Sequence, residues 1–227
     1  MPKVVDPVER RQHVAEAVWR VISRDGLGRA SMRQVAAEAG LSLGSLRHYF
    51  ATHTELLTFS MRLVMDRGAA RLRALEEQRP ADGVFRRDPV EVVETVVSSV
   101  LPLDAERQLE SQVWLAFLGA TVADPQLRAI SDEIYDNVLA MERMMLHQLV
   151  RSGAASGLDL DLEAMRLHSL LDGLSVGAVT RPERVTVRRI RAVVRRHLRS
   201  LCQEGDVSVA AIAPAVQTTA RMPKSTG

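Results

Sequence analysis

The chain has 227 residues, of which 46% are hydrophobic and 26% are charged, and its formal net charge is +2. This balance is typical of a soluble globular protein with room for one mid-sized domain or two small ones. Cys202 is the only cysteine, which excludes an intramolecular disulfide framework and a zinc site built from several cysteines. No apolar run approaches the roughly 20 residues of a membrane span, and the first residues lack the apolar stretch of a signal peptide. We therefore expect a cytoplasmic protein without a membrane partner.

Helical periodicity dominates the chain, and no segment alternates apolar and polar residues as a strand does. The sequence therefore predicts an all-α fold. The first helix is expected from about Pro7 to Arg24, with Gly26 ending it. Three more helices are expected in the first third of the chain: one capped by Ser31 and running through Ala39, one capped by Ser42 and running from Leu43 to about Phe50, and a long one from about His53 to Gln78, opened by the capping-box spacing of Thr52 and Glu55.

Five further helices are expected after a loop marked by Pro80, Asp82 and Gly83. Their predicted limits are Asp88-Pro89 to a point before Pro102, Asp104 to Asp124-Pro125 for the sixth, Pro125 to Arg151 for the seventh, Asp161 to Val179 for the eighth, and from beyond Arg181-Pro182 to about Gln203 for the ninth. Residues 152–157 are turn-like in composition. Residues 205–227 are small, polar and unpatterned, so we expect a disordered tail.

Two short helices within residues 31–50 have the proportions of a helix-turn-helix. Ala36 and Ala39 allow the helices to approach closely, and Gly40 supplies the sharp turn. Leu46 and Phe50 fall on the packed face, which leaves a polar outer face on the second helix. Such a face fits the major groove of DNA, where arginine donates to guanine and serine to several base edges. Any small helical hairpin also has a polar outer face, so the pattern alone leaves both interpretations open.

The distribution of charge agrees with a nucleic-acid partner. Residues 1–50 carry a net charge of +3, residues 61–180 carry −7, and residues 181–227 carry +7. A basic end next to an acidic middle indicates that one end meets a polyanion. The arginines of the last helix are interpreted instead as a solvated rim, because an apolar stripe of the same helix is expected to be buried.

Residues 9–57 resemble the DNA-binding domain of TetR-family transcriptional regulators. The resemblance lies in the long first helix, the Gly40-Leu41-Ser42 turn, the Tyr49-Phe50 close and the Glu55-Leu56-Leu57 opening of the next helix. It implies a DNA-binding domain over residues 1–52 and an effector-binding and dimerisation domain over residues 53–204. The DNA-binding candidates are Ser31, Arg33, Ser42, Leu43, Gly44, Ser45, Arg47, His48, Tyr49 and His53.

Two positions depart from the common pattern of that family. Arg47 stands where members commonly have a tyrosine in the recognition helix, and His53 stands where they commonly have a phosphate-contacting lysine. A permanent guanidinium thus enters the recognition helix, while a mostly neutral imidazole replaces a fixed cation. The departures leave the mode of binding unchanged and put the identity of each contact in question.

Residues 170–201 resemble the last helices of the betaine-type branch of the family, which implies a homodimer joined by the last two helices. Their apolar stripes supply the interface candidates Leu167, Leu171, Leu174, Ile190, Val194 and Leu198. The acidic middle holds large, soft or imidazole side chains that are candidates for contact with a small effector, although most such residues in helical domains are core. These candidates are Trp114, Phe117, Tyr135, Met144, His147 and His168.

The sequence contains no Gly-rich phosphate loop, no nucleophile elbow and no metal-ligand spacing. We therefore expect no catalytic site, metal or cofactor. The favoured function is a repressor that binds a palindromic double-stranded DNA operator and is released by a small-molecule effector. Two alternatives stay open: an activator or architectural DNA-binding protein without an effector, and a helical enzyme or scaffold that contains a helix-turn-helix.

Overall fold

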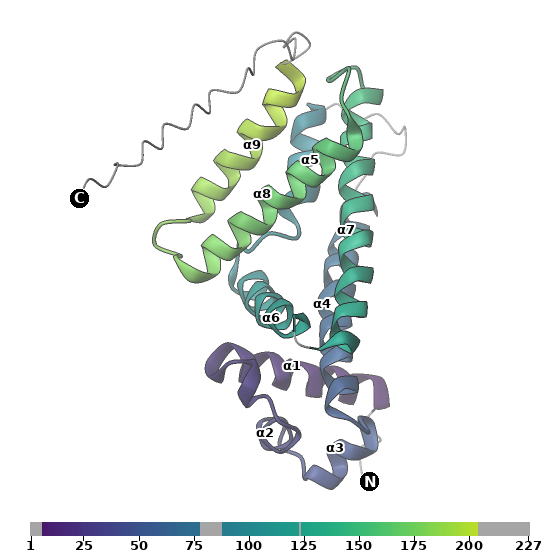
Figure 1. Ribbon diagram of the computed structural model, residues 1–227, viewed down its shortest axis with the longest axis vertical. Helices are drawn as coiled ribbons and strands as arrows, with labels where there is room; N and C mark the ends of the chain where they lie inside the picture. The colour runs from purple at the N-terminus through teal and green to yellow at the C-terminus, as the bar shows by residue number, and fades with distance from the viewer. Residues whose placement is uncertain (1–5, 78–87, 123, 204–227) are drawn as a thin grey trace, which may run out of the picture.

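The computed structural model describes residues 6–77, 88–122 and 124–203, and all regular secondary structure in these ranges is helical. Figure 1 shows an elongated molecule with α1 to α3 at one end, α4 and α7 running along its length, and α8 and α9 at the other end. The elements are α1 (Pro7–Asp25), the single 3₁₀ turn η1 (Leu27–Arg29), α2 (Met32–Glu38), α3 (Leu43–Tyr49), α4 (His53–Glu77), α5 (Pro89–Ser98), α6 (Ala105–Thr121), α7 (Pro125–Arg151), α8 (Leu160–Thr180) and α9 (Val187–Gln203).

Local capping sets the predicted helix starts, which the structure confirms to within one residue. The Ser31 hydroxyl accepts a hydrogen bond from the Gln34 amide, and the Ser42 hydroxyl accepts one from the Ser45 amide. Aspartates 6, 88, 104, 124 and 159 cap five further helices in the same way. The predicted loop around Pro80 and the predicted tail from residue 205 lie outside the described residues.

The start of α4 differs in one detail from the capping box expected at Thr52 and Glu55. The Thr52 hydroxyl accepts from the Glu55 amide at 3.0 Å, as that motif requires. The Glu55 carboxylate, however, accepts from the amide of Ala51 at 2.9 Å, one residue earlier than in the standard motif. Glu55 also pairs with Arg11 of α1, so the box links α4 to the first helix.

One core joins the N-terminal helices to the long helix that follows them. It contains fully buried Trp19 from α1, Leu46 from α3, Met61 from α4 and Phe117 from α6. The core therefore continues past residue 52 into the first half of α4, because apolar side chains of α4 and α6 complete it. The division into domains at residues 52 and 53 stays a prediction, since packing is continuous across it.

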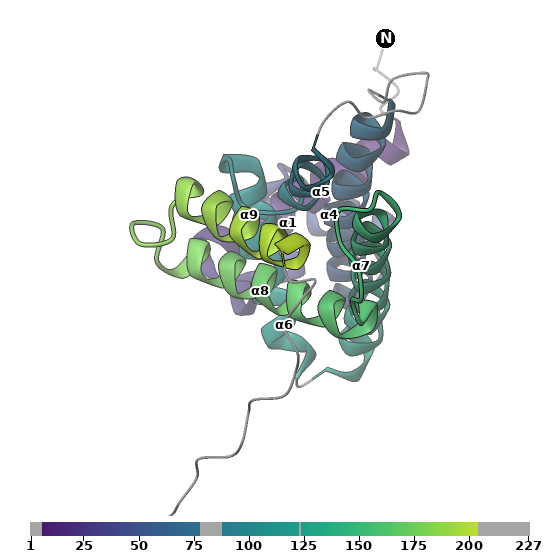
Figure 2. The ribbon, with the colours of Figure 1, turned by 90° about the horizontal axis from the view of Figure 1, so that it is seen from above.

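A second core lies between α5, α7, α8 and α9. In Figure 2, seen from above, α8 and α9 lie side by side and α7 borders α8. The apolar stripe of α9 points into this core: Ile190, Val194 and Leu198 are fully buried. The arginines between them remain at the surface, as a helix with one buried stripe requires. None of the described helices combines the length and the apolar character needed to cross a bilayer.

Candidate nucleic-acid interface and open cavity

The helix-turn-helix of α2 and α3 presents the predicted polar face to solvent. Gly40 adopts a φ of +67°, which allows the sharp reversal between the two helices. Val35 and Leu46 are fully buried beneath it. Of the ten DNA-binding candidates, Leu43 and Tyr49 are half-buried, and the remaining eight are exposed: Ser31, Arg33, Ser42, Gly44, Ser45, Arg47, His48 and His53.

An arginine of α1 holds the carboxyl end of α3 in place. The Arg11 guanidinium donates to the Tyr49 carbonyl at 2.7 Å and lies over the rings of Phe50 and Phe59, 4.3 and 4.7 Å from their centroids. It also pairs with Glu55 at 3.3 Å. Hydrogen-bonding the last carbonyl of α3 while stacking on the core restricts how α3 can tilt. Sequence reasoning missed Arg11 because its partners lie 38 or more residues away.

A second arginine cluster joins α1 to α2. Arg20 and Arg24 each donate to the Glu38 carboxylate at 2.8 Å. These hydrogen bonds lower the pKa of Glu38 below its ordinary value. The carboxyl ends of α2 and of α3 are thus both tied to α1, which restricts how the recognition helix can move.

His53 is exposed, and its ring is already engaged with the protein. Its Nε2 atom lies 2.8 Å from the Ala30 carbonyl oxygen, which can only accept, so Nε2 carries a proton and donates. A neutral ring in this arrangement has no second N–H, whereas a protonated ring offers Nδ1–H to a phosphate. The contact also links the start of α4 to the turn that precedes α2.

Two pairs of opposite charges connect α4 to α6, and one of them reaches the DNA-binding helices. Arg67 of α4 pairs with Glu106 of α6 and with Glu16 of α1. One turn further along, Arg71 pairs bidentately with Glu110, whose side chain is 6% exposed. We call these five residues the interhelix ladder. The sequence did carry a signal for the ladder. The arginines of α4 and the glutamates of α6 each recur four residues apart, which places them on one face of their helix.

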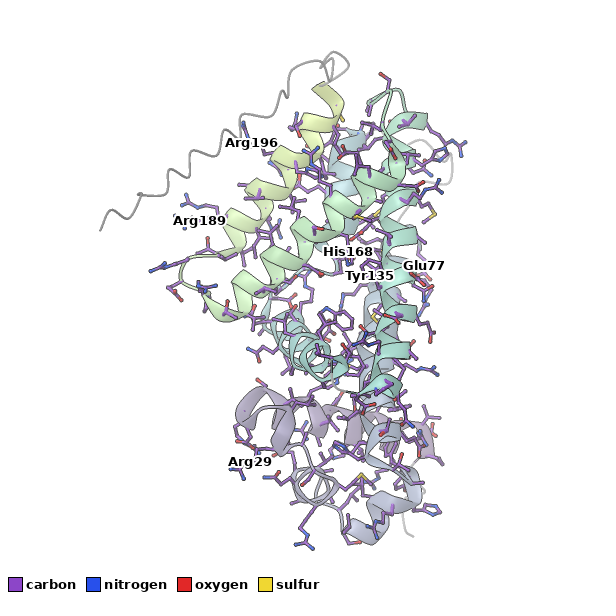
Figure 3. The ribbon with its side chains drawn as sticks, in the orientation of Figure 1. Arg29, Glu77, Tyr135, His168, Arg189 and Arg196 are labelled. Atoms are coloured by element: carbon purple, nitrogen blue, oxygen red, sulfur yellow. The ribbon has the colours of Figure 1, made fainter. Side chains whose placement is uncertain are left out.

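The six effector candidates do not line one cavity in the structure. Trp114 and Phe117 stack with ring centroids 6.1 Å apart, and Phe117 belongs to the N-terminal core. Met144 and His147 are exposed on α7. Tyr135 contacts His168 edge to face at 4.8 Å between α7 and α8 (Figure 3). The set thus divides into a core pair, a surface pair and a pair at a helix contact.

His168 is the centre of a partly buried charge cluster, in which Glu142 is buried and the Asp172 side chain is half exposed. Its Nδ1 atom lies 3.2 Å from the Glu142 carboxylate, and its Nε2 atom lies 3.5 Å from Asp172. The hydrogen bond to Glu142 raises the pKa of His168, while burial raises the pKa of Glu142 and of Asp172. These groups satisfy one another across the contact of α7 with α8, so their first role is structural.

A cavity of about 600 Å³ opens where α4, α5, the start of α6 and α9 meet. None of the six effector candidates lines it. Its wall is mainly charged and hydroxylic, and sequence reasoning missed it because the residues come from four separate segments. The lining consists of Arg71, Ala74, Leu75, Glu91, Glu94, Thr95, Ser98, Ser99, Leu103, Asp104, Arg107, Arg191 and Arg195.

The predicted dimer-interface side chains lie mostly inside the chain, which corrects their assignment. Leu167, Ile190, Val194 and Leu198 are 0% exposed and Leu171 is 6% exposed; Leu174 is half-buried. They pack in the second core against α5 and α7. A stripe that packs on the same chain and a stripe that packs on a second copy have the same spacing, so the sequence could not separate them.

Other apolar side chains of the last two helices face outward. On α8, Leu162 is 60% exposed, Met165 51% and Val176 40%. Met165 lies about one turn after Leu162 and Val176 about three turns after Met165, so the three residues share one side of the helix. On α9, Val187 and Val193 are 41% and 39% exposed. Arg189 and Arg196 project from the same helix away from the molecule (Figure 3). The outer faces of α8 and α9 therefore carry exposed apolar side chains as well as arginines.

Comparison with known proteins gives the same class as the geometry: a DNA-binding transcriptional regulator with an N-terminal helix-turn-helix. The model of "Bacterial regulatory proteins, tetR family" matches residues 15–58, and that of "BetI-type transcriptional repressor, C-terminal" matches residues 89–203. The HTH-type transcriptional regulator PksA of Bacillus subtilis is 38% identical over 207 residues, which is 90% of this chain and 95% of that protein. The chain belongs to the TetR family of transcriptional regulators.

More distant relatives cover the chain to a similar extent. The regulator BetI of Vibrio campbellii is 28% identical, covering 87% of this chain and 94% of that protein. The crystal structure of a transcriptional regulator from Rhodococcus sp. Rha1 superposes with a TM-score of 0.72 at 25% identity, covering 87% of this chain and 98% of that one. A regulator from Saccharomonospora viridis, solved in complex with choline, has a TM-score of 0.68 at 24% identity, covering 87% and 97%.

Proposed function

We propose that this regulator is a repressor that binds a palindromic operator as a homodimer and leaves it when a small molecule binds. The observation that supports DNA binding is the exposed polar face of α3, whose carboxyl end is held by Arg11 of α1. A rigid recognition helix of this kind fits the major groove. Selection of bound sequences from random duplex DNA tests the proposal. It should recover a palindrome with half-sites about 34–36 Å apart or a multiple of that spacing.

The direct DNA contact of Arg47 is tested by replacing it with alanine. Loss of a bidentate contact to guanine should cost about 1–3 kcal/mol of operator affinity, whereas loss of a phosphate contact should reduce the salt slope by about one. Arg151→Ala, at the exposed carboxyl end of α7, is the matched control and should bind normally. Unchanged affinity and slope in Arg47→Ala would remove Arg47 from the interface.

The phosphate role of His53 predicts a dependence of affinity on pH. Because Nε2 already donates to Ala30, only the protonated ring can also donate to a phosphate at the start of α4. Operator affinity should therefore increase as the pH falls from 8 to 6. His53→Lys should bind more tightly than the parent at pH 8 and lose most of this dependence, while His48→Gln should keep it. If the pH dependence of operator affinity survives in His53→Lys, a group other than His53 causes it.

The homodimer is proposed to form through the outer faces of α8 and α9, in place of the buried stripes. Val176→Glu should put a charge in that contact and give monomers that bind the operator weakly, because two half-sites require two DNA-binding domains held together. Val122→Glu is the control, since Val122 is 77% exposed between α6 and α7. Sedimentation of Val176→Glu as a dimer would place the interface elsewhere.

Release by an effector is supported by the interhelix ladder. Arg71 lines the cavity, and Arg67, one turn away on α4, pairs with Glu16 of the first helix. A ligand that draws Arg71 away from Glu110 loosens the contact between α4 and α6. A shift of α4 that follows would move Arg67 and so alter its ion pair with α1. The relative solved with choline supports a response to a small molecule in this chain as well. An activator or architectural protein without an effector would instead stay bound to the operator in the presence of every ligand that enters the cavity.

A further inference from the structure

The charged cavity between α4, α5, α6 and α9 has two groups of opposite sign that form no ion pair with the described residues. Among the described residues, Arg195 pairs bidentately with Glu94 at 2.7 and 3.0 Å, and Arg107 donates to Asp104 at 2.9 Å. Arg71 is neutralised by Glu110, as described above. Within the described residues, neither the guanidinium of Arg191 on α9 nor the carboxylate of Glu91 on α5 forms an ion pair, although Arg195 lies near enough to Glu91 to interact with it electrostatically. Both groups are exposed and both belong to the cavity wall.

The register of α5 against α9 keeps these two groups apart. Arg199 contacts Asp88 and Arg195 contacts Glu94, so residue numbers rise along α5 as they fall along α9, and the two helices are antiparallel. Glu91 lies three residues before Glu94, and Arg191 lies four residues before Arg195. On antiparallel helices these offsets add, which separates the two backbone positions by about 10 Å along the axis. The Glu94–Arg195 pair stands between them.

The two ends of the cavity consequently differ in character. Near the carboxyl end of α5, Arg71 donates to the Ser99 carbonyl at 3.0 Å and Arg107 donates to the Ser98 carbonyl at 2.7 Å. By the antiparallel register, Arg191 belongs to this guanidinium-rich end. Glu91 lies in the first turn of α5, at the opposite end. The apolar side chains in the wall are those of Ala74, Leu75 and Leu103.

We propose that this cavity binds a small zwitterion with a carboxylate at the Arg191 end, a protonated amine at the Glu91 end and a short apolar spacer between them. This ligand class rests on the proposed function, in which the cavity receives the effector. A zwitterion neutralises both remaining charges and gains charge-assisted hydrogen bonds at each end. A ligand with one charge leaves the opposite group of the wall without a counter-charge when water is displaced.

The proposal is tested with 6-aminohexanoate, whose amine nitrogen and carboxyl carbon are about 7–8 Å apart when extended. Hexanoate and hexylamine are its single-charge halves. Calorimetric titration of the full chain should show 6-aminohexanoate binding at least about tenfold more tightly than either half. Arg191→Gln should abolish the advantage of 6-aminohexanoate over hexylamine, and Glu91→Gln should abolish its advantage over hexanoate. Arg151→Gln, which changes an exposed arginine at the carboxyl end of α7 outside the cavity wall, should leave all three affinities unchanged.

Two results would overturn the ligand class. One is the absence of binding of 6-aminohexanoate at millimolar concentration, and the other is equal affinity for the zwitterion and one of its halves. The helical content and operator affinity of Arg191→Gln and Glu91→Gln, measured without ligand, establish that the variants fold. If the ligand class is right but the proposed effector response is wrong, the result differs. In that case 6-aminohexanoate binds the parent chain with the predicted pattern of affinities, and the protein stays bound to the operator.

Discussion

Gly177, in the last turn of α8, sets how closely the turn into α9 approaches that helix. A Cβ atom at this position would lie 2.8 Å from Cγ2 of Val185 and 3.5 Å from its Cβ and Cγ1. Normal carbon contacts are about 3.5–4.0 Å. The valine cannot move aside easily, because it is β-branched and half-buried against the second core. Gly177→Ala must therefore displace the turn of residues 181–186.

The expected cost follows from two opposing effects. Replacing glycine by alanine inside a helix stabilises it by about 1 kcal/mol, while overpacking of this kind costs about 1–3 kcal/mol. Gly119→Ala is the matched control, since Gly119 is also helical but has no atom within 4 Å of an added Cβ. The free energy of unfolding of Gly177→Ala should thus fall about 1–3 kcal/mol below that of Gly119→Ala.

Denaturation by urea measures this difference directly, provided that both variants unfold in one transition with equal slopes. For a chain of this size, the control should melt about 2–4 °C above the parent and Gly177→Ala well below the control. Equal stabilities of the two alanine variants would refute the reasoning, because they would mean that the turn accommodates the methyl group without strain.

Two further predictions concern the reading helix and the buried histidine. Arg11→Gln removes the guanidinium that donates to the Tyr49 carbonyl and positions α3. The variant should therefore bind the operator more weakly in gel-shift titration, although Arg11 itself makes no DNA contact in this proposal. Full affinity in a folded variant would contradict the positioning role. Because Glu142 raises the pKa of His168 above 6.5, the protonated ring stabilises the fold below that pH, and the benefit is lost as pH rises through the folded pKa. The deficit of His168→Gln, about 1–3 kcal/mol at pH 6, should therefore shrink toward pH 9, whereas a constant deficit would exclude this ionisation.

Local sequence determined the helices and the reading head. Ser31, Ser42 and Gly40 act through their own and adjacent backbone groups, so their effect is readable from a few residues. The buried positions Leu46 and Phe50 leave only one face of α3 outward, and that face was predictable from helical spacing alone. These features depend on interactions between residues that are near each other in the chain.

Tertiary structure alone decided which surfaces are internal and which charges meet. The stripe through Ile190 and Val194 has the spacing of an interface, yet α5 and α8 of the same chain pack against α9 and cover it. The cavity draws its wall from four segments, and only the antiparallel register of α5 and α9 separates Glu91 from Arg191. Helical periodicity indicates that a face is buried but does not identify the element that covers it. Which charges pair between two helices depends on how those helices pack against each other.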